Sequence, residues 1–199
     1  MRKLIFLTFF LFSFALVFPA GASVSYDLAD EVIGNVEAFP LERSAVEAKL
    51  GKPDFMEEMP GFPVPLEYYI IEGSEDLSHV YLAYGASDDA QKTYAVGVVM
   101  KGIDFPTMRE IISAEAGEDE ETARMIVLEG PEFVVVDLFE QSATSHPMWV
   151  LFEEFPVQGE KRLVSTLMPS ESLLSYFAAA HPEFKEVLQK AVLERTGGE

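Results

Sequence analysis

The stretch that decides the fold reads LEYYIIEGSEDLSHVYLAYGASDDAQKTYAVGVVM and covers residues 66–100. It holds three runs rich in β-branched and aromatic residues, a composition typical of β-strands. Short polar connections of hairpin length separate the runs, and such connections join antiparallel strands. The pattern predicts three strands of one antiparallel sheet: Leu66–Glu72, Leu77–Tyr84 and Thr93–Lys101.

A helix is predicted just before these strands. Residues 41–50 carry apolar side chains at roughly helical spacing, Pro40 stands at a first turn, and Gly51 stands where a helix ends. Similar signals predict a second helix over residues 106–116. Four further strand candidates follow it: Thr122–Glu129, Phe133–Phe139, Met148–Glu154 and Arg162–Met168. This order of helices and hairpin-linked strands predicts an α+β fold.

The same kinds of residue bound the two predicted helices. Phe39-Pro40 precedes the first and Phe105-Pro106 precedes the second, and each pair leads to a glycine, Gly51 or Gly117. The offset between the two segments is 66 residues, and β-rich runs follow both. We interpret the chain as an internal repeat of two similar helix-plus-sheet units, the alternative being coincidence between two short segments. The pattern does not decide whether the units share one sheet.

The C-terminal segment is predicted to be helical. Ser170 is a candidate cap for a helix over residues 171–180, and His181-Pro182 predicts a break. A second helix follows, with an apolar stripe of Phe184, Val187, Leu188, Ala191 and Val192. The predicted organisation is a first αβ unit over residues 23–104, a second αβ unit over 105–169, and C-terminal helices over 170–199.

The first 22 residues have the pattern of a secretory signal peptide. Arg2 and Lys3 precede the apolar run Leu4–Phe18, and Ala20-Gly21-Ala22 supplies the small residues of a cleavage site. The apolar run is shorter than the roughly 20 residues that span a bilayer, although an uncleaved anchor is the alternative. We expect a secreted protein, periplasmic or extracellular, without stable membrane insertion after cleavage.

The composition is strongly acidic and lacks cysteine. The chain has 14 Lys and Arg against 34 Asp and Glu, a net charge of −20. Loss of residues 1–22 would leave 12 basic residues against 34 acidic ones, a net charge of −22. Such a charge argues against nucleic acid or an anionic membrane surface as partner, because both attract basic proteins. The lack of cysteine excludes disulfides, a thiol nucleophile and Cys-based metal sites.

One short stretch resembles a known family. In SAVEAKLGKPD, residues 44–54, Val46, Leu50, Gly51 and Pro53 fit the pattern V-x-x-x-L-G-x-P. This resembles the BamE/SmpA family of outer-membrane assembly lipoproteins. The resemblance implies a helix followed by an antiparallel sheet with an aromatic first strand. Tandem units of this kind are similar to the β-lactamase inhibitory proteins, which are exported and act by binding another protein.

Motifs for catalysis or cofactors are absent from the sequence. The three histidines, His79, His146 and His181, lack the H-x-x-x-H or H-x-H spacing of metal ligands. The chain also has no G-x-S-x-G and no glycine-rich nucleotide motif. We therefore predict no catalytic residue, no metal and no cofactor.

Carboxylates in two unusual places leave open questions. Asp137 lies in the apolar run 133–139, where it is either a costly buried carboxylate or one that faces water or pairs with Lys or Arg. We favour the second reading. Acidic residues also cluster at 115–121, and we expect a solvated loop there, the alternative being a Ca²⁺ site.

Aromatic side chains on the strand candidates suggest a binding surface. If helices cover only one face of the sheet, the other face presents Tyr68, Tyr69, Tyr81, Tyr84, Trp149 and Phe152. The alternative is that loops and the C-terminal helices cover that face as well. We expect an exported, non-catalytic binding or envelope-assembly protein that acts on a protein partner. The alternatives are a soluble carrier of a small apolar ligand and a secreted carboxylate-dependent hydrolase.

Overall fold

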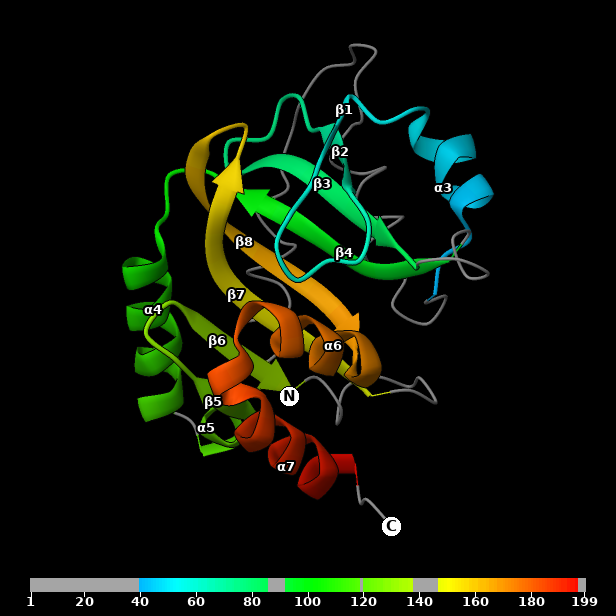
Figure 1. Ribbon diagram of the computed structural model, residues 1–199. Helices are drawn as coiled ribbons and strands as arrows, with labels where there is room; N and C mark the ends of the chain where they lie inside the picture. The colour runs from blue at the N-terminus through cyan, green and yellow to red at the C-terminus, as the bar shows by residue number, and fades with distance from the viewer. Residues whose placement is uncertain (1–39, 86–91, 119, 138–146, 197–199) are drawn as a thin grey trace.

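The strands form one eight-stranded antiparallel sheet (Figure 1). The computed structural model describes residues 40–85, 92–118, 120–137 and 147–196. Across the sheet the strand order is β1-β2-β3-β4-β8-β7-β6-β5. The strands are β1 (Phe55–Glu57), β2 (Leu66–Ile70), β3 (Leu77–Tyr84), β4 (Thr93–Met100), β5 (Ile126–Glu129), β6 (Phe133–Asp137), β7 (Met148–Val157) and β8 (Glu160–Pro169).

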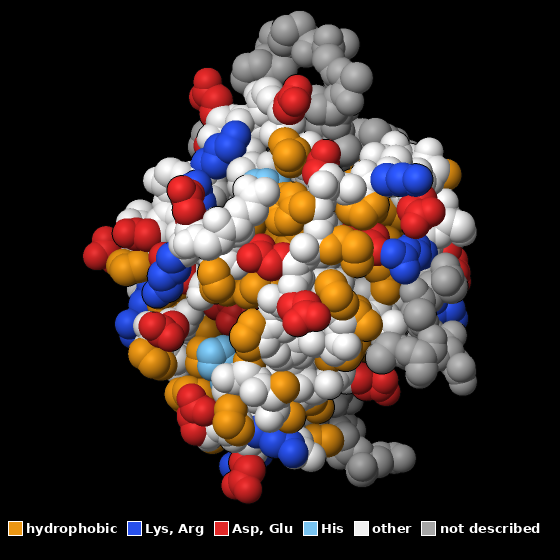
Figure 2. Space-filling view, turned by 45° about the horizontal axis from the view of Figure 1, so that its top comes forward, with side chains coloured by type: hydrophobic (Ala, Val, Ile, Leu, Met, Phe, Trp, Pro, Cys, Tyr) orange, Lys and Arg blue, Asp and Glu red, His pale blue; other side chains and the backbone are white. Residues whose placement is uncertain are grey.

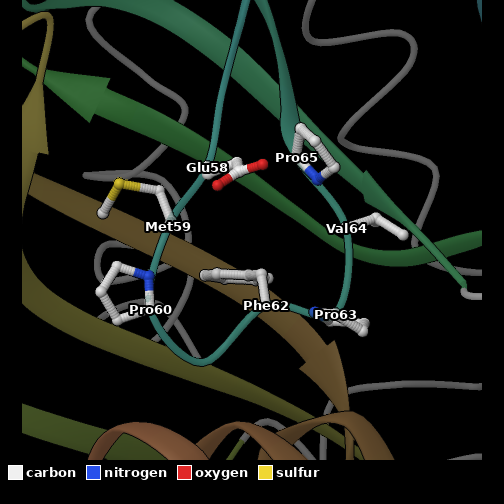
Figure 3. Close-up of a pocket in the computed structure, with 7 residues that line it drawn as sticks. All are labelled: Glu58, Met59, Pro60, Phe62, Pro63, Val64 and Pro65. Carbon is white, nitrogen blue, oxygen red and sulfur yellow. The ribbon is translucent and has the colours of Figure 1, made fainter.

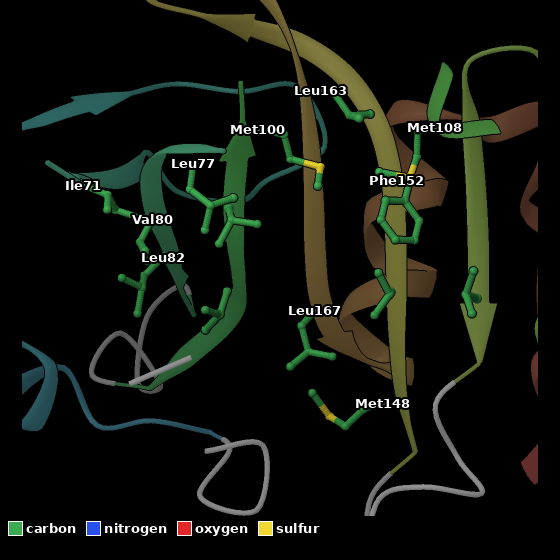
Figure 4. Close-up of a cluster of buried hydrophobic side chains, with 14 of the residues drawn as sticks. Ile71, Leu77, Val80, Leu82, Met100, Met108, Met148, Phe152, Leu163 and Leu167 are labelled. Carbon is green, nitrogen blue, oxygen red and sulfur yellow. The ribbon is translucent and has the colours of Figure 1, made fainter. Parts of the chain in front are cut away.

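Helices pack on both faces of the sheet, which confirms the α+β class. The helices are α3 (Arg43–Leu50), α4 (Phe105–Glu118), α5 (Glu120–Met125), α6 (Ser170–Ala180), the short 3₁₀ helix η3 (Pro182–Phe184) and α7 (Lys185–Thr196). One apolar cluster joins the sheet to α3 and α4, and its strand side chains include Leu82, Phe152 and Leu167 (Figure 4). A second cluster joins the opposite face to α6 and α7, which lie in front of the sheet in Figure 1.

Two four-stranded meanders meet in the middle of the sheet. Strands β1 to β4 follow one another, strands β5 to β8 do the same, and β4 pairs with β8. Gly97 stands opposite Thr166 in this central pair. The two predicted αβ units therefore share one sheet. Their origin as an internal repeat stays a prediction.

The side chains of the strands alternate between two apolar interiors. On β2, Tyr69 packs toward the α3 side and Tyr68 packs toward the α6 side. Because both faces are buried, the strands read as nearly continuous apolar runs rather than as alternating polar and apolar residues. The strands could therefore be predicted from composition.

A close backbone approach lies at the centre of the sheet. The side chain of Tyr81 on β3 passes over Gly97 of β4, and its hydroxyl hydrogen-bonds to that of Thr166 on β8. A Cβ atom at Gly97 would stand 2.3 Å from Cζ of Tyr81. Glycine at this position is therefore required by the buried tyrosine.

Three local predictions are wrong, and one strand was missed. The run predicted as a strand over 122–129 begins as helix α5, since Glu, Ala, Arg and Met are good helix formers. Strand β1 was not predicted. Ser170 does not cap α6, because its hydroxyl instead accepts a hydrogen bond from the indole N–H of Trp149 at 2.8 Å. Val187 is 56% exposed, so the α7 stripe that packs inward centres on Leu188 and Val192.

Among the described residues, no helix has both the length and the apolar character to cross a bilayer. The predicted signal peptide and His146 lie outside the described residues.

Candidate functional site

The six aromatic residues predicted to form a binding surface are all in the interior. Each is at most 3% exposed. This corrects the expectation that they form an exposed patch, because helices cover one face of the sheet and a loop together with α6 and α7 covers the other. The six residues do not lie together either, since Tyr69, Tyr84 and Phe152 pack on the α3 side and Tyr68, Tyr81 and Trp149 on the α6 side.

A buried polar cluster lies beneath α6. The Tyr176 hydroxyl donates a hydrogen bond to Glu153 Oε1 at 2.6 Å, and Nε2 of His181 lies 3.3 Å from Glu153 Oε2. Glu153 is only 4% exposed, although it sits on a strand among apolar neighbours. Burial, together with the charge of Glu153, raises the pKa of Tyr176 well above its usual range, so its hydroxyl stays protonated and donates.

Aromatic rings enclose the imidazole of His181. The ring centroid of Phe133 lies 4.8 Å from that of His181, and the ring centroid of Phe177 lies 5.1 Å away. Glu153 and these rings fix His181 where α6 ends and η3 begins. Through these contacts the cluster connects β7 to the break between α6 and α7. Its acid, Glu153, and its base, His181, already contact each other. We interpret it as a structural cluster.

The other predicted polar sites have structural partners or lie outside the described residues. Asp137 is buried, and its Oδ2 lies 3.6 Å from Nη1 of Arg195, which agrees with the favoured pairing with a basic residue. The acidic run 115–121 was expected to be a solvated loop, but residues 115–118 belong to α4 and residues 120–121 to α5, and the side chains of 118–122 are not described. Within the described ranges, no group of three or more His, Asp or Glu side chains is placed to hold a metal ion.

Similar polar contacts connect α3 to the sheet. Arg43 forms an ion pair with Glu67, a buried carboxylate on β2, and its guanidinium lies 4.9 Å from the ring centroid of Tyr84. The hydroxyl of Tyr69 lies 3.4 Å from Glu67 Oε2. Charged groups buried on this side of the sheet are therefore paired and hydrogen-bonded.

His79 gives the fold a pH dependence. Burial lowers the pKa of His79 below 6.5, and the charges of Lys101 and Arg162 lower it further, against a smaller opposite effect of Asp54. Below pH 6.5, His79 therefore binds a proton more readily in the unfolded chain than in the folded one. The contribution of His79 to the free energy of unfolding is complete above pH 6.5 and is lost as the pH falls below it. Between pH 7.5 and 5.5 we expect the melting temperature to fall less in His79→Gln than in the unmutated protein, because glutamine does not bind a proton. Equal slopes in thermal melts at several pH values would contradict this.

The surface loop between β1 and β2 is apolar and tightly anchored. Its turn is of type II: Phe62 N–H bonds to the Met59 carbonyl at 3.2 Å, Pro60 stands at the second position, and Gly61 has φ +89°. Met59 is buried in the α6-side cluster, and the Phe62 ring lies 5.0 Å from that of Tyr176. A Cβ at Gly61 would stand 2.5 Å from Cε2 of Tyr176, so only glycine fits here.

An open hollow lies between the two arms of this loop (Figure 3). Its volume is about 460 Å³. The lining residues are Glu58, Met59, Pro60, Phe62, Pro63, Val64 and Pro65. In Figure 3 the carboxylate of Glu58 and the ring of Phe62 both lie between the arms, while Val64 points away from them.

One face of the molecule combines apolar and acidic groups. On the face seen in Figure 2, hydrophobic side chains gather near the middle and acidic side chains lie among them. Lysine and arginine lie mostly toward the edges of this face (Figure 2). Sequence reasoning missed the loop as a site. Three prolines within the seven residues 59–65 were the signal that could have pointed to it.

Comparisons with known proteins found no match to this chain. No protein-family model, no curated protein and no solved structure matches the chain. The resemblance of residues 44–54 to the BamE/SmpA family stays a prediction.

Proposed function

We propose that this chain is an exported, non-catalytic binding protein that acts through contacts with a basic protein partner. The excess of 34 acidic over 14 basic residues favours such a partner by long-range attraction. Export rests on the signal-peptide pattern of residues 1–22. The resemblance of residues 44–54 favours a role in envelope assembly.

The observation that carries the proposal is the surface around the loop of residues 58–65. Pro60 and Pro63 are exposed, Val64 is half-buried, and the loop is held in place from below by Met59 and Phe62. Protein interfaces commonly combine an apolar centre with a polar rim. A rigid loop also loses little conformational freedom on binding, which favours affinity.

The two alternative functions have less support. A carrier would hold its ligand in an enclosed apolar cavity, and the hollow of the loop is open to solvent. A hydrolase would use convergent titratable groups in an accessible site. Within the described part of the chain, Glu153 and His181 converge in this way, but Tyr176 and aromatic rings enclose them. The capture experiment below also tests the carrier alternative, because a bound small molecule would be retained with the purified protein.

Affinity capture from the native cell envelope tests the proposal. The tagged protein is expressed from its full-length sequence, isolated after export, and its partner is identified by mass spectrometry. We expect one stoichiometric basic partner, and a one-to-one complex when both purified proteins are mixed. Raising the salt from about 50 to 500 mM is expected to weaken the complex at least tenfold, because exposed charges are screened.

A pair of charge reversals supplies the control. Glu183→Lys changes an exposed acid of η3, on the α6 side, and Glu110→Lys changes an exposed acid of α4, on the opposite side. We expect Glu183→Lys to weaken the complex and Glu110→Lys to leave it nearly unchanged. An isolated protein without any stoichiometric partner, or a complex that salt does not weaken, would contradict the proposal.

A further inference from the structure

The hollow in the loop of residues 58–65 has a single charged group. Glu58 is the only ionisable residue of its lining, and every other lining residue is apolar. Among the described residues, no hydrogen bond or ion pair is formed by the Glu58 carboxylate, which lies exposed between the arms of the loop (Figure 3). The hollow therefore presents a carboxylate without a protein partner among the described residues, next to apolar walls.

Lysine and arginine side chains match both demands. Each has an apolar stem and a cationic head, so the stem can cover apolar walls while the head pairs with a carboxylate. The aromatic ring of Phe62 in the lining adds an attractive surface for a cation. A volume of about 460 Å³ has room for one such side chain together with part of the neighbouring backbone.

The shape of the hollow is also fixed before a partner binds. The type II turn at Pro60-Gly61 is fixed from below by Tyr176, against which Gly61 packs. Proline limits the backbone of the remaining arm at Pro63 and Pro65. A preformed hollow selects its occupant by shape as well as by charge.

A second hollow of the same volume provides a comparison. It also measures about 460 Å³ and is lined by Phe105, Pro106, Arg109, Glu110, Ser113 and Pro131. Its lining holds a cation, Arg109, which pairs with Glu129, and also an exposed acid, Glu110. Volume alone therefore does not distinguish the loop hollow, which differs in having an acid and no cation in its lining.

We infer that the hollow between the arms of the loop is a socket for one Lys or Arg side chain of the partner. Glu58 pairs with the cationic head, and Phe62 and the prolines contact the stem. This inference rests on the proposed function, since it names the point at which a basic partner is recognised.

The chemistry of the socket can be tested without the natural partner. The probe is Nα-acetyl-L-arginine methylamide, added to the ¹⁵N-labelled protein expressed from its full-length sequence, with amide shifts followed by NMR. The neutral analogue Nα-acetyl-L-citrulline methylamide is the matched probe. We expect saturable shifts at Gly61, Phe62 and Val64, with a Kd of about 10 mM for the arginine probe. The citrulline probe should bind at least about threefold more weakly.

Two variants with the same change of charge locate the effect. Glu58→Gln is expected to weaken the arginine probe about threefold and to leave the citrulline probe unchanged. Glu110→Gln, in the second hollow, should change neither. If the loop amides show no saturable shift, or if Glu58→Gln binds the arginine probe as well as the unmutated protein does, the socket is wrong.

Repeating the capture experiment with Glu58→Gln separates the two proposals. If Glu58→Gln captures less partner than the unmutated protein and Glu110→Gln does not, both the socket and the proposed function are supported. A partner that the variant captures as well as the unmutated protein does overturns the socket and leaves the proposed function standing. Arginine binding at the loop without any captured partner overturns the proposed function and leaves the chemistry of the hollow standing.

Discussion

Replacing Gly97 by alanine is expected to destabilise the protein by about 3 kcal/mol, which is at the upper end for an overpacked core. The added Cβ would stand 2.3 Å from Cζ and 2.4 Å from the hydroxyl oxygen of Tyr81. The tyrosine ring has no room to yield, because it is fully buried between Tyr68 and Phe155 and is hydrogen-bonded to Thr166. Urea unfolding followed by circular dichroism measures the loss.

A second glycine supplies the control for this prediction. A Cβ at Gly117, in helix α4, would meet nothing within 4 Å, so Gly117→Ala should leave stability unchanged or raise it by up to about 1 kcal/mol. Combining Gly97→Ala with Tyr81→Leu should cost at least about 1 kcal/mol less than the sum of the single effects, since the smaller side chain removes the clash. Additive effects, or a stable Gly97→Ala protein, would show that Tyr81 does not constrain this position.

Replacing Glu153 by alanine is expected to cost about 3 kcal/mol. The change removes the acceptor of the Tyr176 hydroxyl and the partner of His181, both 3.3 Å or less from the Glu153 carboxylate. Buried polar groups left without partners carry the full cost of their lost hydration. Urea unfolding of the purified variant gives the value directly.

A double-mutant cycle with Tyr176→Phe tests whether the contact itself is responsible. We expect the two effects to overlap by about 1 kcal/mol, because the hydroxyl has no acceptor once Glu153 is gone. Glu160→Ala, at an exposed position on β8, should change stability by less than about 0.5 kcal/mol. If Glu153→Ala matches Glu160→Ala in stability, the cluster does not hold α6 to the sheet.

The sequence predicted the local elements better than their assembly. Composition and hairpin-length connections identified β2, β3, β4, β6, β7 and β8, and the proline and glycine signals identified α3 and α4. The pairing of β4 with β8 joins residues far apart in the chain, and no local pattern encodes such a pair. The short strand β1 is formed because it pairs with β2, although its own sequence is mixed.

The candidate site was harder to predict than the fold. The aromatic strands were expected to present an exposed apolar surface, but α6, α7 and the loop bury one face of the sheet and α3 and α4 pack on the other. Such burial depends on the tertiary structure. Glu153 lies in the apolar strand β7, and the same reasoning that singled out Asp137 could have singled it out. The role of Glu58 follows from the path of the loop, since a single glutamate beside prolines predicts no geometry.

The place of β8 in the middle of the sheet determines when the sheet can be completed. Val96–Val99 of β4 pair with Val164–Leu167 of β8, which come 65 to 71 residues later in the chain. During synthesis β4 therefore has one unpaired edge until residue 169 has emerged, and such an edge invites pairing with other chains. Contacts of long sequence separation also form slowly. A protein with this topology completes its sheet late, so the unpaired edge of β4 needs protection from aggregation until β8 has paired with it.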